Sequence, residues 1–268
     1  MKRNQKSPLA ASILEPLTVD RVSDDKSVAP RRIIKLIRKW LEDCDEHHNS
    51  CTPRVNSEVL PTRLIDVTNP EEPKIIVTAD LSKDTLSEIR YIALSHMWGN
   101  ISEKVVTTKG NIDARKVGIP IMLLNNNALG FSNAIAITSA LDCSFLWIDC
   151  LCILQGSNGD FDQEADKMQM IFNRAYCVLA VCNSPSGGKA GFLNHPRPQS
   201  KCARIGDLFI STITNDFERD VLQSPLSRRG WVLQERALAR RTVYFTETQT
   251  YWECGDGIRC ETLAKLKK

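Results

Sequence analysis

Three short apolar segments, separated by stretches with helical spacing, constrain the fold of this chain most strongly. They are residues 91–96, 145–154 and 176–182. Between them, residues 131–141 and 165–175 repeat their apolar side chains at intervals of three and four, as one face of a helix does. Strands alternating with helices are typical of a parallel sheet with helices on its faces. We therefore predict an α/β fold with a mainly parallel sheet and flanking helices, in which 145–154 is a central strand that contains Asp149.

Further elements are predicted on both sides of this alternation. Residues 31–44 have the spacing of an amphipathic helix, and 59–67 with 75–78 read as a hairpin. A second helix is expected near 231–238, followed by a β-hairpin over 242–254. The first helix is basic on its polar side, a pattern that can bind anionic membranes or acidic partners. We favour the more common arrangement, in which its apolar stripe packs on the domain.

Composition limits the class of protein. The chain has 268 residues, 42% of them hydrophobic and 25% charged, which excludes a wholly disordered chain, a collagen and a coiled-coil rod. The 35 basic and 32 acidic residues give no reason to expect nucleic acid. No apolar run approaches the ~20 residues that span a bilayer, and Pro8, Glu15 and Pro16 interrupt the first segment that resembles a signal sequence. We predict a cytoplasmic protein with reduced cysteines and no transmembrane segment.

The same patterns suggest how the chain is divided. Residues 1–29 are polar and without period, and we predict a disordered tail there. We expect a helix-and-hairpin extension at residues 30–80 and the main domain at 81–255. Residues 256–268 are expected to form a tail, which is a candidate for truncation.

A small group of metal-binding residue types follows the first predicted helix. Cys44, His48 and Cys51 have ligand-like spacing, with His47 adjacent. A structural zinc ion requires four nitrogen or sulfur ligands, so this group needs a fourth ligand from a distant part of the chain. The alternative is a helix end followed by a turn, and we favour that reading and predict no metal.

Three segments, taken in order, resemble the fungal heterokaryon-incompatibility (HET) domain. They are YIALSHMWG at 91–99, LWIDCLCILQ at 146–155, and LSRRGWVLQER at 226–236 running into YWEC at 251–254. The upstream PTRLID at 61–66 and the Cys/His group resemble the lead-in of such proteins. His96-Met97 departs from the family's usual Tyr-Cys. The resemblance implies non-self recognition and cell-death signalling, and a distant relation to the flavodoxin-like Toll/interleukin-receptor (TIR) fold.

The TIR relation suggests an enzymatic site. Some TIR domains cleave NAD with a glutamate on a helix that follows a strand, and FDQE at 161–164 is similar in kind. Glu164 is therefore the candidate catalytic residue, since a carboxylate can stabilise an oxocarbenium-like transition state. The alternative is a solvated residue in the first turn of a helix, where a negative charge is favourable.

Other motif residues are candidates for binding or for a structural role. Ser95, Trp98 and Gly99 follow a predicted strand, at the sheet edge where nucleotides bind in such folds, and we group Asp149 with them as substrate-binding. Asp149 could instead pair with Arg228, Arg229 or Arg236. We predict a structural polar network made of Arg229, Gln234, Glu235 and Arg236. The alternative is that these residues form part of the functional site.

Three functions stay open at this point. The first is incompatibility signalling by NAD cleavage, with NAD as substrate and no predicted cofactor. The second is a non-enzymatic module that acts through protein partners or self-association. The third is an inactive, truncated paralogue. Loss of toxicity on Glu164→Ala would favour the first function, and loss on surface mutation would favour the second.

Overall fold

The computed structural model describes residues 28–51, 60–183, 191–193, 202–205, 208–211, 216–261 and 265–266. The predicted disordered tail lies outside them, apart from its last two residues.

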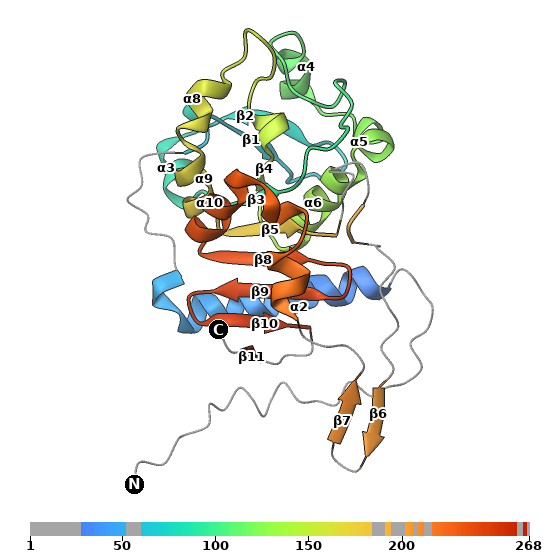
Figure 1. Cartoon of the computed structure of the whole chain (residues 1–268). Helices are drawn as coiled ribbons and strands as arrows, with labels where there is room; N and C mark the ends of the chain where they lie inside the picture. The colour runs from blue at the N-terminus through green and yellow to red at the C-terminus, as the bar shows by residue number, and fades with distance from the viewer. Residues whose placement is uncertain are drawn as a thin grey trace.

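A mixed sheet of nine strands organises the described chain (Figure 1). Its order is β11-β10-β9-β8-β5-β3-β4-β1-β2. The strands are β1 (Arg63–Asp66), β2 (Lys74–Val77), β3 (Tyr91–Ser95), β4 (Phe145–Trp147), β5 (Cys177–Val181), β8 (Arg241–Phe245), β9 (Thr250–Cys254), β10 (Gly257–Cys260) and β11 (Lys265–Leu266). Two further strands, β6 (Cys202–Ile205) and β7 (Leu208–Ser211), pair with each other as a separate ribbon.

The prediction of a mainly parallel sheet is wrong, although the α/β class is confirmed. β4, β3, β5 and β8 are parallel, as the alternating pattern predicts. The other five pairings of this sheet are antiparallel: β1 with β2 and β4, and the series β8-β9-β10-β11. Short turns join β1 to β2, β8 to β9 and β9 to β10. Connections this short can link only antiparallel neighbours, whereas parallel neighbours need a long crossover.

The predicted central strand over 145–154 is also wrong in its second half. β4 ends at Trp147, and a short helix, α7 (Asp149–Cys152), follows at once. Cys150, Leu151 and Cys152 are all buried in this helix. An apolar run that is buried on every side has the same composition in a strand and in a helical turn, so its pattern cannot separate the two. As a result, Asp149 lies just beyond the sheet rather than within it.

Helices cover both faces of the sheet. α2 (Val28–His47) lies behind β9 and β10 in Figure 1, whereas α10 (Gly230–Leu238) lies in front of the sheet. The predicted packing of α2 is confirmed, because Ile37 and Trp40 are buried and the Trp40 ring lies 6.1 Å from that of Trp252 in β9. The remaining helices are η1 (Asn49–Cys51), η2 (Thr78–Asp80), α3 (Lys83–Glu88), α4 (Ile112–Val117), α5 (Ile121–Asn127), α6 (Leu129–Ala140), α8 (Phe161–Ala165), α9 (Met168–Arg174), η4 (Glu218–Leu222) and η5 (Leu226–Arg228).

Among the residues that the structure describes, no helix is both long enough and apolar enough to cross a bilayer.

Candidate functional site

Residues from three separate segments meet beyond the carboxyl ends of β3 and β4. Ser95, the last residue of β3, donates its hydroxyl hydrogen to Glu235 of α10. Trp98, in the loop after β3, donates its indole N–H to Asp149 at the start of α7. Because β3 and β4 are parallel neighbours, their carboxyl ends lie at one edge of the sheet. We call Ser95, His96, Trp98, Asp149 and Glu235 the strand-end cluster.

Asp149 is held by hydrogen bonds at both oxygens. Trp98 donates to Oδ2, and the backbone N–H of Cys150 donates to Oδ1 at 2.7 Å. Arg229 does not appear among these donors: its guanidinium donates to the backbone carbonyl of His96, at 2.5 Å. The structure thus offers Asp149 an indole and a backbone amide where the sequence suggested an arginine.

Glu235 is the acid of the cluster that responds to pH near neutrality. Its side chain is buried, and burial raises its pKa to about 7, with a further contribution from the negative charge of Asp149. The hydrogen bond from Ser95 and the positive charge of Arg229 lower the pKa, but only in part. Glu235 therefore exists in both protonation states near neutral pH, which is the property of a group suited to proton transfer.

His96 is a member of the cluster that the sequence analysis missed. Its ring packs edge-on against Phe131, with centroids 5.0 Å apart, and burial lowers its pKa. A neutral imidazole thus lies 3.8 Å from Oδ1 of Asp149. The available signal was its position, because it directly follows Ser95 in the same segment.

His96, Asp149 and Cys150 also have ligand atoms within 4.8 Å of one another. Burial and the charge of Asp149 raise the pKa of the Cys150 thiol well above its usual value. A structural zinc ion needs four ligands, and only three meet here, one of them a carboxylate, so we interpret His96 and Asp149 as part of the strand-end cluster.

The loop after β3 places Trp98 at the edge of the site. Gly99 follows with φ +51°, in the left-handed region that glycine adopts most readily. Trp98 is half-buried against the core, while Gly99 is exposed. In this structure, Gly99 allows the chain to turn after Trp98.

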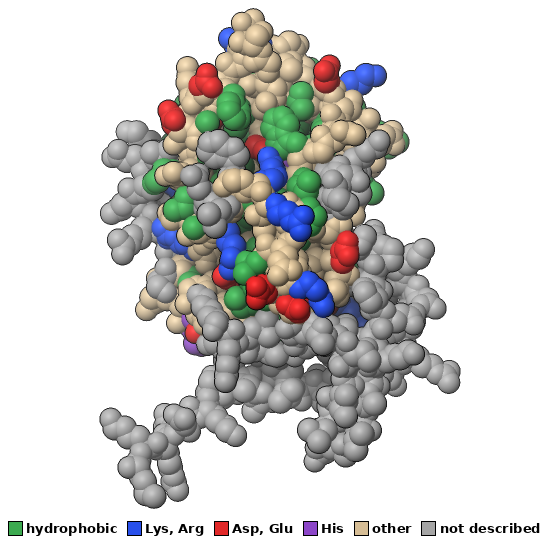
Figure 2. Space-filling model, viewed as in Figure 1, with side chains coloured by type: hydrophobic (Ala, Val, Ile, Leu, Met, Phe, Trp, Pro, Cys, Tyr) green, Lys and Arg blue, Asp and Glu red, His purple; other side chains and the backbone are tan. Residues whose placement is uncertain are grey.

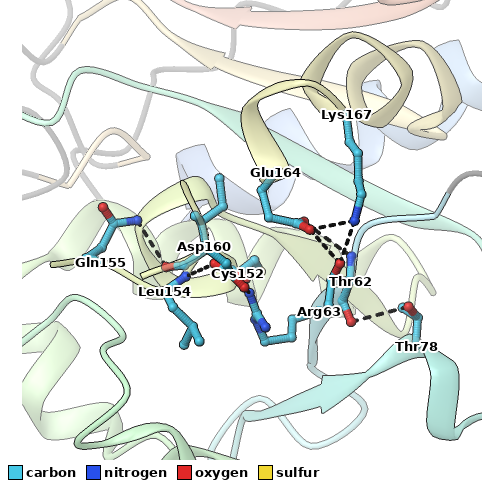
Figure 3. A network of polar contacts seen from close by, with 10 residues as sticks. Thr62, Arg63, Thr78, Cys152, Leu154, Gln155, Asp160, Glu164 and Lys167 are labelled. Atoms are coloured by element: carbon cyan, nitrogen blue, oxygen red, sulfur yellow. Dashed lines mark hydrogen bonds and ion pairs between the residues drawn. The ribbon is translucent and has the colours of Figure 1, made fainter. Parts of the chain in front are cut away.

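Glu164, the predicted catalytic residue, lies in a different network (Figure 3). Its Oε1 accepts the hydroxyl hydrogen of Thr62 at 2.5 Å and lies 2.7 Å from the ammonium group of Lys167. Lys167 also donates to the hydroxyl of Thr62, at 3.0 Å. With 2% of its surface exposed, Glu164 is not the solvated first-turn residue that was the alternative. Its contacts connect α8 to the segment that leads into β1.

A second polar group anchors the same region. Arg63, in β1, donates to the carbonyl of Cys152 at 2.7 Å and pairs with Asp160 (Figure 3). The other Asp160 oxygen accepts the backbone N–H of Leu154 at 2.8 Å. These contacts connect β1, α7 and the start of α8.

Arg236, another member of the predicted polar network, lies in a separate group of contacts. Arg236 forms two 3.0 Å hydrogen bonds with Glu253 of β9, which also accepts from the Tyr244 hydroxyl at 2.7 Å. The side chain of Gln234 lies outside the described residues.

Figure 2 shows the molecule from the same side as Figure 1. Lys and Arg side chains lie over the middle of the face in view, with Asp and Glu side chains lower in the picture.

The predicted metal-ligand group gains a member. Cys44, His48 and Cys51 come together with Cys254, the last residue of β9, and the four ligand atoms all lie within 4.8 Å of one another. Sequence reasoning missed Cys254 as a partner. The available signal was the YWEC segment at 251–254, where Cys254 ends a motif of the family resemblance.

Comparison with known proteins agrees with these motifs. Residues 91–235, more than half of the chain, match the family described as "Heterokaryon incompatibility protein (HET)". Searches of curated proteins and of solved structures find no match. The matched range contains all five residues of the strand-end cluster. The chain therefore belongs to the heterokaryon incompatibility (HET) family.

Proposed function

We propose that this chain acts in non-self recognition and cell-death signalling, and that it does so by hydrolysing the nicotinamide–ribose bond of NAD at the strand-end cluster. Membership of the HET family supports an incompatibility-type function in general. One observation supports the enzymatic part most strongly. Segments far apart in the matched range place two carboxylates, Asp149 and Glu235, at one sheet edge, and burial raises the pKa of Glu235 to about 7.

The two acids suit different roles in this reaction. Asp149 accepts an N–H hydrogen bond at each of its two carboxylate oxygens, which fixes its orientation. As an anion it would stabilise the ribosyl cation that develops while the C–N bond breaks. The electron pair of that bond leaves with nicotinamide, so the leaving group needs no proton. Water then forms a bond to the ribosyl carbon, and ionised Glu235 accepts the proton that water loses.

Neighbouring groups support binding and orientation. Trp98 is half-buried and presents an aromatic surface beside Asp149, which is suited to stacking on the nicotinamide ring. Ser95 donates to Glu235 and so holds that carboxyl group toward the site. This assignment replaces Glu164 as the catalytic candidate, because Glu164 lies outside the strand-end cluster, in a network with Thr62 and Lys167.

The test is NAD consumption by the purified chain, assayed at high protein concentration. Wild type is compared with Glu235→Gln, Asp149→Asn and Glu164→Gln, and with Glu42→Gln, an exposed position on α2, as the matched control. We expect Glu235→Gln and Asp149→Asn to lower turnover at least ~100-fold, with Glu42→Gln unchanged. A folded Glu235→Gln variant with full turnover would refute the assignment.

A toxicity assay in the cytoplasm of a fungal host separates the enzymatic reading from the non-enzymatic one. The enzymatic proposal predicts that Glu235→Gln and Asp149→Asn abolish both NAD loss and cell death. Cell death that persists in both variants, without NAD loss, would instead establish a module that acts through protein contacts.

A further inference from the structure

Three thiols and one imidazole converge where the N-terminal helix meets the antiparallel edge of the sheet. Cys44 lies in the last turns of α2, His48 directly follows that helix, and Cys51 ends η1. Cys254 comes from β9, more than two hundred residues later. Their Sγ and ring-nitrogen atoms all lie within 4.8 Å of one another. The set has the number and the type of ligands that a structural zinc site needs.

The burial of these groups points to a closed site. Cys44, Cys51 and Cys254 are at most 5% exposed, and the side chain of His48 is 14% exposed. None of the three cysteines is in a disulfide in the structure. A catalytic zinc ion keeps one position open for water, whereas a structural ion is enclosed by four protein ligands. Three buried cysteines and a largely enclosed histidine supply four protein ligands, which favours the structural type.

Secondary contacts orient the ligands as they do around metal ions. The backbone N–H of Gly255 donates to Sγ of Cys51 at 3.2 Å. Nδ1 of His48 lies 3.5 Å from Sγ of Cys254, while Nε2, on the other side of the ring, lies 3.7 Å from a carboxylate oxygen of Asp256. A carboxylate behind a ligating histidine fixes the tautomer of the ring and its direction.

Local structure presets three of the ligands. The backbone N–H of His48 donates to the carbonyl of Cys44 at 3.0 Å, and that of Cys51 donates to the carbonyl of His48 at 2.9 Å. Consecutive turns thus direct Cys44, His48 and Cys51 to one point. The fourth ligand is placed by β9, whose neighbours in the sheet are β8 and β10.

We propose that Cys44, His48, Cys51 and Cys254 bind one Zn²⁺ ion, which fastens α2 to β9. On binding, three thiol protons pass to solvent and the histidine binds as neutral imidazole. Three thiolates and one Zn²⁺ leave a single net negative charge, and the guanidinium of Arg241 lies close enough to Cys44 to interact with it electrostatically. The role of this ion is structural and independent of NAD hydrolysis.

The first experiment measures metal in the full chain, purified without chelator from cells supplied with zinc. We expect about one zinc ion per chain by elemental analysis. Cys254→Ser and Cys51→Ser should lower this content at least about tenfold. Cys143→Ser is the matched control, because Cys143 is also buried but donates to the carbonyl of Arg90 instead of facing the cluster. It should retain the ion.

A second measurement protects the test against a variant that does not fold. Co²⁺ replaces zinc in the wild-type chain, and its absorption reports the ligands directly. The proposal predicts thiolate-to-cobalt charge transfer and the visible bands of a tetrahedral ion, and a chelator should lower the thermal midpoint until one equivalent of zinc restores it. Absence of both zinc and the tetrahedral cobalt spectrum would overturn the proposal. So would full zinc in folded Cys254→Ser, or an intact mass that shows a disulfide between two of these cysteines.

Discussion

Substitution of Glu164 by alanine separates a structural acid from a catalytic one. Glu164 is the residue that sequence resemblance favours as catalytic, yet its carboxylate lies buried between Thr62 and Lys167. We therefore expect Glu164→Ala to lower the free energy of unfolding, while the fraction that folds keeps its NAD turnover.

The magnitude follows from the contacts that are lost. A hydrogen bond to a charged group contributes about 1.5–3 kcal/mol, and the one from Thr62 is short and buried at its acceptor. The side chain of Lys167 is 37% exposed, so water compensates for most of the lost ion pair and its share is under about 1 kcal/mol. Together the loss is about 2–3 kcal/mol. Glu164→Gln keeps an acceptor for Thr62 and should cost only about 1 kcal/mol.

Thermal unfolding followed by circular dichroism measures the effect. For a chain of this size, 1 kcal/mol shifts the midpoint by about 2–4 °C, so Glu164→Ala should lower it by about 4–12 °C. Asp162→Asn is the control, since Asp162 lies in the same helix and is exposed. Its midpoint should change by less than about 2 °C.

Two results would refute this reasoning. A midpoint for Glu164→Ala within about 1 °C of wild type would mean that the contacts with Thr62 and Lys167 contribute little to stability. Abolished NAD turnover in Glu164→Gln with an unchanged circular dichroism spectrum would make Glu164 catalytic, as the TIR resemblance implies.

Three further predictions concern the sheet and the strand-end cluster. Because folded Glu235 holds its proton up to a pKa of about 7 while an unfolded glutamate ionises near 4.5, wild-type stability should fall as pH rises between these values. Glu235→Gln should remove up to about 3 kcal/mol of this pH-dependent loss of unfolding free energy, measured by urea titrations at several pH values. Equal pH profiles for wild type and Glu235→Gln would contradict the raised pKa of Glu235. Trp252→Ala should cost about 3–5 kcal/mol, since Trp252 is 1% exposed and packs on Trp40, and a urea midpoint close to wild type would be inconsistent with that packing. Arg236→Ala should lower the free energy of unfolding by about 1–2 kcal/mol in the same assay, because Glu253 then keeps only the hydrogen bond from the Tyr244 hydroxyl. An unchanged free energy of unfolding would mean that solvent replaces the contact between Arg236 and Glu253.

The elements with the strongest local patterns were predictable. β3 and β5 are near-continuous apolar runs, as parallel strands buried on both faces are. The hairpin of β8 and β9 and the stripe of α2 were predicted from period and turn residues. The helical turn at Asp149 was not, because a buried apolar run has one composition in either conformation.

The candidate site was predictable as a set of motifs but not as a geometry. Sequence order placed Ser95, Trp98, Asp149 and Glu235 among the notable residues. It did not show that Glu235 receives the hydrogen bond of Ser95, or that Glu164 is occupied by Thr62. These partners depend on how α10 and α8 lie against the sheet, which no local pattern contains.

What the sequence determined by itself is the central alternation of strands and helices, the family, and the residue types at each motif. Those properties follow from apolar periodicity and turn chemistry, which act over a few neighbouring residues. The tertiary structure decided the antiparallel pairing of β1 with β4, the pKa of Glu235, and the meeting of Cys254 with Cys44, His48 and Cys51. Burial and proximity set these features, and both arise only when segments distant in the chain pack together.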